Sequence, residues 1–193
     1  MKNLLFFSNN KNKIIEIKKI FKKFNLKILS LSDLEISDEP EENGQTFEEN
    51  AKIKSDYGFN KTGFPCFADD SGICIESLDW KPGVFSKRFL NNFKSNKACF
   101  ESIIKSAKKN SKQNAYFKTS ISLTVKESHN VVFNGRIDGK ISEQAKGKFG
   151  FGYDPVFIPK NYNKTLAELS TKEKNEISHR SIAVTKLINF LIN

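Results

Sequence analysis

Cysteine and histidine are scarce in this sequence of 193 residues, which has three of the first and two of the second. Cys66, Cys74 and Cys99 form no Cys-x-x-Cys pair, and an odd number of cysteines cannot close into a complete disulfide set. Two histidines add little to a zinc site built with such cysteines. We therefore expect three reduced thiols that are buried or idle, with neither a disulfide framework nor a zinc centre.

Long hydrophobic runs are also lacking. The longest apolar run near the beginning, Leu4–Phe7, is far shorter than a membrane-spanning helix or the hydrophobic region of a signal peptide requires. With 38% hydrophobic and 28% charged residues, the composition is typical of a soluble globular protein. The expected location is the cytoplasm.

A concentrated basic segment is absent as well, although 32 Lys and Arg residues against 22 Asp and Glu give a net charge of +10. The lysines are spread along the whole chain, without an arginine-rich tract or an RNP-like aromatic motif. This distribution favours a surface that attracts a small polyanion over one that binds nucleic acid.

The length allows one domain, or at most two intimate lobes, and no repeat or linker divides it. Hydrophobic periodicity predicts a buried strand at Leu4–Phe7, an amphipathic helix over 14–24 and a second strand at Lys27–Leu29. We expect the two strands to be parallel, because a helix connects them. The chain is thus predicted to begin as an α/β fold.

The rest of the chain continues this mixture. Thr46 and Glu49 have the spacing of a capping box and predict a helix from there to Phe59, after an acidic loop at Ser37–Gln45. Strands are predicted at 64–68 and 73–77 around a turn at 68–72, at Ala115–Val125, and at 131–142 with turns at Asn134-Gly135 and Asp138-Gly139. Helices are predicted at Lys94–Lys109 and Ser181–Ile192. Because the central strands have the pattern of antiparallel neighbours, we expect a mixed sheet.

The polar stretch SNNKNK (residues 8–13) lies between the first strand and the first helix. Free backbone N–H groups and the helix dipole make such a corner a natural cradle for phosphate, and Lys11 and Lys13 add positive charge. It lacks the glycines of a Walker A loop. Ser8 or Asn9 as a simple helix cap is the alternative interpretation.

Acidic residues form the second pattern. Glu41, Glu42, Glu48, Glu49, Asp69 and Asp70 are hard oxygen ligands of the kind that magnesium prefers, together with water and phosphate oxygens. For Glu48 and Glu49 a favourable first helical turn explains the charge. Asp69 and Asp70 stand between apolar runs, where a capped turn explains them less well than metal binding or general-base work. Since neighbours in a strand point to opposite faces, the pair can act together only if a turn at Ser71-Gly72 ends the strand.

Two later stretches add candidate contacts for a ligand. In GKFGFGYDPVF (147–157), glycines alternate with aromatic residues, so that the segment is either a platform for a planar base or a tight turn with core aromatics. In KNEISHRS, His179 and Arg180 are either a donor pair for a ligand oxygen or residues of a helix start.

Taken together, six ordered motifs resemble the inosine triphosphate pyrophosphatase family. They are SNNKNK, ENGQTFEENAKIKS, FADDSG, KPGVFSKRF, GKFGFGYDPVF and KNEISHRS, and they run through essentially the whole chain as one domain, 1–193. The resemblance implies an α/β fold with a long twisted mixed sheet flanked by helices, and two lobes around a central nucleotide cleft. It also implies a homodimer that hydrolyses dITP, ITP and XTP to the monophosphate and pyrophosphate with Mg²⁺.

The family motifs also imply roles for individual residues. Asp70 would be the proton acceptor, and Glu42, Asp69 and Asp70 would bind magnesium. The substrate contacts would be Ser8, Asn9, Asn10, Lys11, Asn12 and Lys13 with Lys54 at the phosphates, and Ser71, Phe151, Gly152, Tyr153, Asp154, Lys174, His179 and Arg180 elsewhere on the nucleotide, Phe151 by stacking on the base. The motifs depart from the family at Ser8-Asn9-Asn10, usually Thr-Gly-Asn, and at Lys87-Arg88-Phe89, usually Ala-Arg-Tyr.

These roles suit the chemistry. Cleavage between the α- and β-phosphates needs an in-line water, a base and cations near the leaving pyrophosphate. Hypoxanthine and xanthine present a 6-oxo acceptor to donors such as His179 and Arg180, whereas the 6-amino group of adenine would leave those donors unpaired. The alternatives are a magnesium-dependent hydrolase with another base preference, and a nucleic-acid-binding module.

Overall fold

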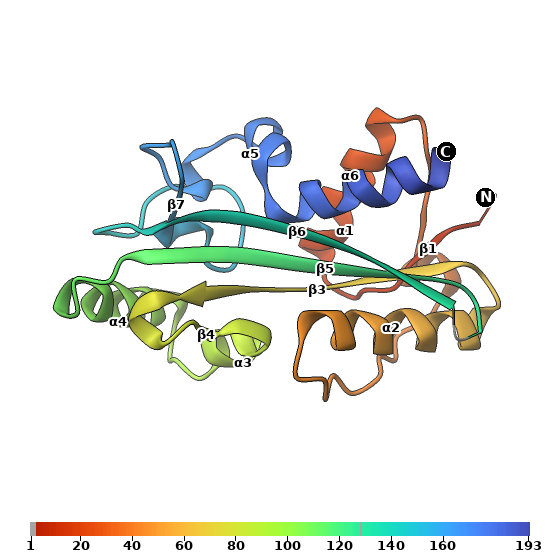
Figure 1. Cartoon of the computed structure of the whole chain (residues 1–193), viewed down its shortest axis with the longest axis horizontal. Coiled ribbons are helices and arrows are strands. Elements are labelled where there is room, and N and C mark those ends of the chain that lie inside the picture. Colours follow the sequence, from red (N-terminus) through yellow and green to blue (C-terminus); the bar gives the residue numbers. More distant parts are fainter. Residues whose placement is uncertain (1–2, 128) are drawn as a thin grey trace. The chain divides into compact units, whose positions relative to one another are not determined.

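The computed structural model describes residues 3–127 and 129–193 (Figure 1). The chain forms two compact units. The first comprises Met1–Asp70, Thr119–Gly135 and Arg180–Asn193, and the second comprises the remaining segments, Ser71–Lys118 and Arg136–His179. The boundaries between the units therefore fall inside two of the predicted motifs, after Asp70 and after His179.

The first unit begins with strand β1 (Leu5–Phe6), helix α1 (Lys11–Lys23) and strand β2 (Leu29–Ser30), and β1 and β2 are parallel as predicted. β1 also pairs in parallel with the beginning of β3 (Cys66–Ile75). Helix α2 (Phe47–Thr62) covers one face of these strands, while α1 and α6 (His179–Ile192) cover the other (Figure 1).

Residues of β1 and β3 alternate between two hydrophobic clusters in this unit. Phe6 and Phe67 pack with α1 and α6, whereas Leu5, Cys66 and Ala68 belong to the cluster on the other face. This alternation is the two-residue period of an extended strand. It fixes the face on which each following residue of β3 must lie.

In the second unit, β4 (Lys81–Pro82) pairs antiparallel with the end of β3, and β7 (Phe157–Pro159) pairs antiparallel with β6 (His129–Ile141). Helices α3 (Ser86–Asn91), α4 (Asn96–Lys109) and α5 (Thr171–Ile177) belong to this unit. Its core joins Ile73 and Ile75 of β3 to Phe100 and Ile103 of α4 and to Phe157. Short 3-10 helices lie at Leu31–Leu34, Glu76–Leu78, Gly83–Phe85, Asp154–Val156 and Leu166–Glu168.

The hydrogen-bonded strand order is β2-β1-β3-β5-β6-β7, with β5 at Asn114–Lys126 and β4 paired to β3 off this path. Parallel and antiparallel pairs occur in one sheet with helices beside it, so the predicted α/β fold with a mixed sheet is confirmed. The capping box of α2 is confirmed as well, since Glu49 N donates to Thr46 Oγ1 at 3.1 Å and Glu49 Oε2 accepts from Thr46 N at 3.3 Å.

Three predicted turns are wrong. β3 continues through Asp69, Asp70, Ser71 and Gly72, and β6 continues through both Asn-Gly and Asp-Gly pairs. A Cβ atom on Gly72 would overlap the carbonyl oxygen of Gly83, and one on Gly139 would overlap that of Ile158. Both glycines thus allow a neighbouring backbone to approach the strand closely. Because glycine is also common in turns, the sequence pattern alone does not distinguish these two roles.

The three cysteines are free and buried, which confirms the prediction of reduced thiols. Burial raises the pKa of the Cys66 thiol, and it raises that of Cys99 to about 11. Both thiols are therefore protonated near neutral pH and unreactive. In the described ranges, no helix combines the length and the apolar character that crossing a bilayer requires.

Candidate active site

The predicted site residues fall into two groups, one in each unit. Ser8, Asn9, Asn10, Lys11, Asn12, Lys13, Glu42, Lys54, Asp69, Asp70 and Arg180 belong to the first unit, and Ser71, Phe151, Gly152, Tyr153, Asp154, Lys174 and His179 belong to the second. Each group has its own network of buried polar contacts, described separately below.

In the first unit, the polar loop before α1 is held by its own side chains. Asn10 is the N-cap, and its Oδ1 accepts from the backbone N–H groups of Asn12 at 3.1 Å and Lys13 at 3.2 Å. The interpretation of Ser8 or Asn9 as the cap is therefore wrong, although Ser8 Oγ accepts from Asn10 N at 3.2 Å. Because Asn10 already bonds these N–H groups, we expect lysine side chains to supply most of the attraction for phosphate here.

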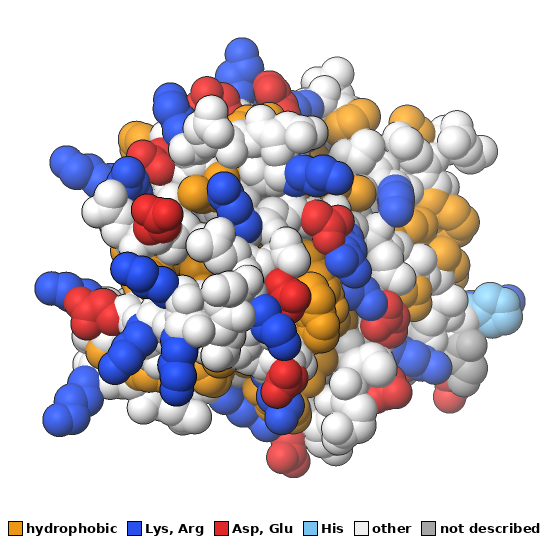
Figure 2. All heavy atoms as spheres, turned by 60° about the vertical axis from the view of Figure 1, so that its left-hand side comes forward, with side chains coloured by type: hydrophobic (Ala, Val, Ile, Leu, Met, Phe, Trp, Pro, Cys, Tyr) orange, Lys and Arg blue, Asp and Glu red, His pale blue; other side chains and the backbone are white. Residues whose placement is uncertain are grey.

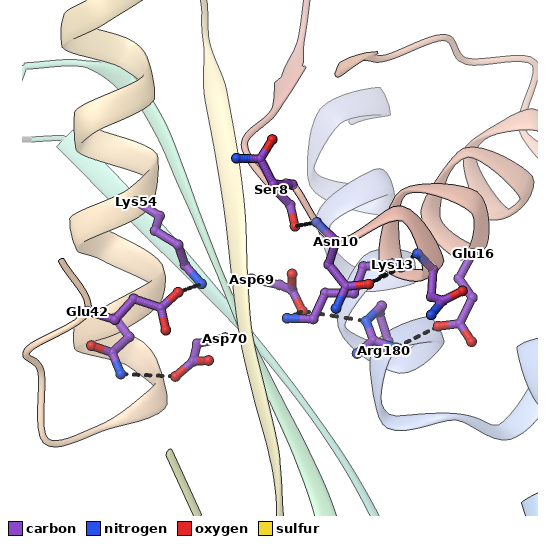
Figure 3. A network of polar contacts seen from close by, with 12 residues as sticks. Ser8, Asn10, Lys13, Glu16, Glu42, Lys54, Asp69, Asp70 and Arg180 are labelled. Carbon is purple, nitrogen blue, oxygen red and sulfur yellow. Dashed lines mark hydrogen bonds and ion pairs between the residues drawn. The ribbon is translucent and has the colours of Figure 1, made fainter. Parts of the chain in front are cut away.

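Asp69 lies on the α1 side of β3, among buried charges (Figure 3). Its Oδ2 is 2.9 Å from Lys13 Nζ and 3.5 Å from Arg180 Nε, and Arg180 NH1 donates to Glu16 Oε2 at 2.6 Å. Two acids and two bases thus alternate in one buried network, which balances their charges. Burial lowers the pKa of Lys13, and Asp69 opposes that effect.

Glu16 was not among the predicted site residues. It is buried on α1 beside Ile17, although the other charged residues of that helix are lysines. A single acid next to a buried position of an otherwise basic helix is the signal that could have identified it.

Asp70 lies on the opposite, α2 side of the strand, with Glu42 and Lys54 (Figure 3). Lys54 Nζ donates to Glu42 Oε1 at 2.6 Å, and Asp70 Oδ2 accepts from Asn50 Nδ2 at 3.1 Å. Burial raises the pKa of the Asp70 carboxyl, Glu42 adds to the rise, and Lys54 opposes it. Burial also disfavours the charge of Lys54, but Asp70 and Glu42 outweigh this and the pKa of Lys54 is raised.

The two adjacent aspartates therefore do not share a face. Ala68 and Asp70 alternate with Phe67 and Asp69 along an uninterrupted strand, so that the expected turn that would bring both carboxylates together is absent from β3. The structure brings Asp70 together with the Glu42–Lys54 pair, and Asp69 together with Lys13 and Arg180.

The first unit fits a magnesium ion on its Asp70 side. Magnesium binds through one or two protein carboxylates, with waters and phosphate oxygens completing its coordination. Glu42 and Asp70 supply two such carboxylates around the Lys54 ammonium. No cluster of three or more His, Cys, Asp or Glu side chains that could hold a metal occurs in the described part of the chain.

In the second unit, the glycine-rich segment folds around Asp154. Asp154 Oδ2 accepts from Phe151 N at 2.8 Å and from Lys174 Nζ at 2.6 Å, and Lys174 Nζ lies 4.7 Å from the centre of the Phe151 ring. Gly150 has φ of +75°, and a Cβ there would overlap the Asp154 carboxylate. The segment thus presents Phe151 half-buried above a buried ion pair.

Other predicted residues of this unit differ in exposure. Tyr153 is buried, and its hydroxyl donates to the backbone oxygen of Ser86 at 2.7 Å, so that this aromatic belongs to the core. Ser71 is half-buried in β3. His179 is buried and stacks on Phe117, with ring centres 4.7 Å apart and an angle of 9° between the planes. Phe117, which was not predicted, thereby fixes the plane of the imidazole.

A mixed α/β sheet with a buried lysine–carboxylate pair, Lys13–Asp69, beside the N-terminus of α1 is an arrangement that suits the binding of phosphorylated ligands. The chain belongs to the Ham1 family, whose model matches residues 4–190. This match confirms that the six motifs identify a family that spans nearly the whole chain.

Relatives and solved structures agree with this membership. The chain is 42% identical to a dITP/XTP pyrophosphatase of Christiangramia forsetii over 188 residues, 97% of this chain and 98% of the relative. It is 35% identical to a dITP/XTP pyrophosphatase of Bacillus subtilis, covering 99% and 98% of the two chains. A Ham1 protein structure from Coxiella burnetii is 33% identical, covers 100% of this chain and 99% of its own, and superposes with a TM-score of 0.88.

Proposed function

We propose that this enzyme hydrolyses the non-standard purine nucleoside triphosphates dITP, ITP and XTP to the monophosphate and pyrophosphate. The observation that carries the proposal is the buried Asp70 carboxylate beside the Glu42–Lys54 pair. A base flanked by an acid and a cation is what attack of water on a polyphosphate requires. The printed names of the relatives support the same reaction class.

Asp70 accepts the proton of the attacking water in this proposal. Its Oδ2 accepts a hydrogen bond from Asn50, and burial raises its pKa while Lys54 opposes the rise. Glu42 and Asp70 would hold a magnesium ion, which when bound would neutralise phosphate charge. The predicted third ligand, Asp69, lies on the other face of β3 with Lys13 and Arg180. We propose that Asp69 positions these two cations.

The phosphates would be held by cations of the first unit. Lys11 and Lys13 project from the first turn of α1, where the helix dipole adds to their attraction for an anion. Lys54 supplies a third positive charge next to the proposed base. As pyrophosphate leaves, its growing negative charge is the group that these lysines stabilise.

The purine would be bound by the residues that the family motifs assign to it. Phe151 offers a half-buried ring for stacking, and the Lys174–Asp154 pair holds its backbone in place. His179 would donate to the 6-oxo group, with Arg180 beside it in sequence as the other predicted donor. The 6-amino group of adenine would leave such a donor unpaired, which disfavours dATP.

Product analysis with dITP, XTP, dATP and dGTP in the presence of magnesium tests this proposal. We expect monophosphate and pyrophosphate from dITP and XTP, and much slower turnover of dATP and dGTP. Release of orthophosphate, or equal rates on all four nucleotides, would contradict it. Omission of magnesium should abolish turnover. If turnover persists in the presence of EDTA, the metal has no part in the reaction.

A pure nucleic-acid binder is the less favoured alternative. Lys and Arg side chains on the face in Figure 2 are interspersed with acidic and uncharged groups, without a continuous basic stripe on that face. A binder also gains nothing from acids buried beside its cations. A homodimer and a cytoplasmic location stay predictions.

A further inference from the structure

Asn50 connects two parts of the first unit that carry the proposed metal ligands. Its side-chain amide donates from Nδ2 to Asp70 Oδ2 at 3.1 Å, and its Oδ1 accepts from the backbone N–H of Gly44 at 2.8 Å. Gly44 lies two residues after Glu42 in the acidic loop. One amide group thus bonds the strand that carries Asp70 and the loop that carries Glu42.

The position of Asn50 on α2 explains why it can do this. Asn50 and Lys54 are separated by four residues, and therefore lie one turn apart on the same helix face. Both are buried, with 2% and 6% of their surface exposed. Lys54 contacts Glu42, and Asn50 contacts Asp70 and the Glu42 loop. One face of α2 therefore supports both proposed metal-binding segments, the loop with Glu42 and the strand with Asp70.

The loop packs closely against this amide. A Cβ atom on Gly44 would lie 2.7 Å from Asn50 Oδ1 and 2.7 Å from Glu49 Cβ, closer than such atoms approach in proteins. A side chain at position 44 would therefore displace either the loop or the amide. Glycine at this position is part of the same arrangement, because it lets the backbone reach Asn50.

We propose that Asn50 is a positioning residue, which holds the Asp70 carboxylate and the Glu42 loop in place for a divalent cation. The inference rests on the proposed function and extends it to a residue that is not one of the proposed metal ligands. An amide suits this task because one end accepts from the loop while the other donates to the carboxylate, without adding charge. Partners that orient metal ligands typically change metal affinity or activity 10- to 100-fold when they are removed.

Asn50→Ala removes both hydrogen bonds and provides the main test. We expect the magnesium concentration for half-maximal dITP hydrolysis to rise about 10- to 100-fold. The affinity for Mn²⁺ alone, measured from the spin-resonance signal of the free ion without nucleotide, should fall by a similar factor. Asn60→Ala, an exposed asparagine on the same helix, is the matched control and should change neither quantity.

Two further variants separate the two hydrogen bonds. Asn50→Asp keeps an acceptor for Gly44 N–H but loses the donor to Asp70, so kcat should fall at least about 10-fold while hydrogen exchange of residues 40–46 stays at the wild-type rate. Gly44→Ala disturbs the loop from the other side and should speed that exchange and raise the half-activating magnesium concentration. If Asn50→Ala fails to fold, these two variants carry the test.

A purely structural role for Asn50 would lower the folded fraction and the melting temperature, yet leave the half-activating magnesium concentration of the folded protein unchanged. That result would overturn the inference, as would unchanged Mn²⁺ affinity in Asn50→Ala or wild-type kcat in Asn50→Asp. If the wild-type protein itself releases no pyrophosphate from dITP, the proposed function fails. The Mn²⁺ and hydrogen-exchange measurements on the variants still test Asn50 in that case.

Discussion

Asp69 and Asp70 are adjacent in sequence and carry their carboxylates to opposite sides of strand β3 (Figure 3). Asp69 pairs with Lys13 and Arg180 on the α1 side, and Asp70 bonds to Asn50 on the α2 side. Each of the two carboxylates in this apolar stretch thus has its own polar partners, and these partners come from different elements of the first unit. This division lets the two residues be tested independently.

Asp70→Asn should slow turnover strongly without loss of the fold. Asparagine has nearly the same shape but cannot accept the proton of water, and removal of a general base typically costs about 10²- to 10⁴-fold in rate. We expect kcat for dITP to fall in this range, while the affinity for dITP in calorimetry changes only a few-fold. Pyrophosphate release gives the rate, and circular dichroism checks the fold. Near-normal turnover would exclude Asp70 as the base.

Asp69→Asn should mainly lower stability. Removing its charge leaves Lys13 and Arg180 in a buried network with one acid fewer, and such a loss typically costs about 3–5 kcal/mol. Urea denaturation measures the free energy of unfolding. In the double variant Lys13→Met/Asp69→Asn the uncompensated lysine is gone, so the two losses should be less than additive. Strict additivity would mean that the two side chains do not interact.

Local signals predicted much of the first unit. The periodicity of Ile17 and Ile20 marks a buried face of α1, and the Thr46–Glu49 capping box marks the beginning of α2. Each signal involves residues within one or two helical turns. For this reason sequence patterns alone place these elements, together with the parallel β1–β2 pair that α1 connects.

The missed features depend on partners distant in sequence. Gly72 led to the prediction of a turn, because the sequence does not show that the backbone of Gly83 lies against it. Glu16 meets Arg180 across 164 positions, and Asn50 meets Asp70 across 20. No local sequence pattern indicates which distant segment will contact a residue. For this reason the sequence predicted two strands instead of the single β3, and it did not identify Glu16 and Asn50.

Asp33 offers a test of pH dependence away from the site. The Ser30 hydroxyl, then the Ser30 backbone N–H and Lys18, lower the pKa of the Asp33 carboxyl to about 2. In the unfolded chain an aspartate titrates near ~3.9. The folded state therefore favours the ionised form, and this stabilisation is present above pH ~4 and is lost as the pH falls towards 2.

Asp33→Asn imitates the protonated carboxyl and should remove this contribution. Because Asp33 is largely exposed, solvent screening limits the effect to below about 1 kcal/mol. The difference between the urea midpoints of the variant and the wild type should be largest at pH 6 and should shrink as the pH falls from 4 towards 2. A constant difference over this range would show that the loss does not come from the carboxylate charge.

Lys174→Met should weaken nucleotide binding more than it slows chemistry. Lys174 pairs with the buried Asp154, which also bonds the backbone of Phe151, so that the loss of the ammonium frees the segment that carries the proposed stacking ring. We expect KM for dITP to rise about 10-fold or more, a typical cost of breaking a charge-assisted hydrogen bond, with kcat changed less. Steady-state kinetics over a range of dITP concentrations separates the two constants.

Lys172→Met is the matched control for this variant, because Lys172 lies on the same helix, α5, but is exposed. It removes the same charge from the protein without touching Asp154, so KM should stay near the wild-type value. Phe151→Leu should imitate Lys174→Met in KM, since it removes the ring that the ion pair supports. If Lys174→Met lowers kcat while KM stays constant, Lys174 acts in the chemical step instead of holding the base-binding segment.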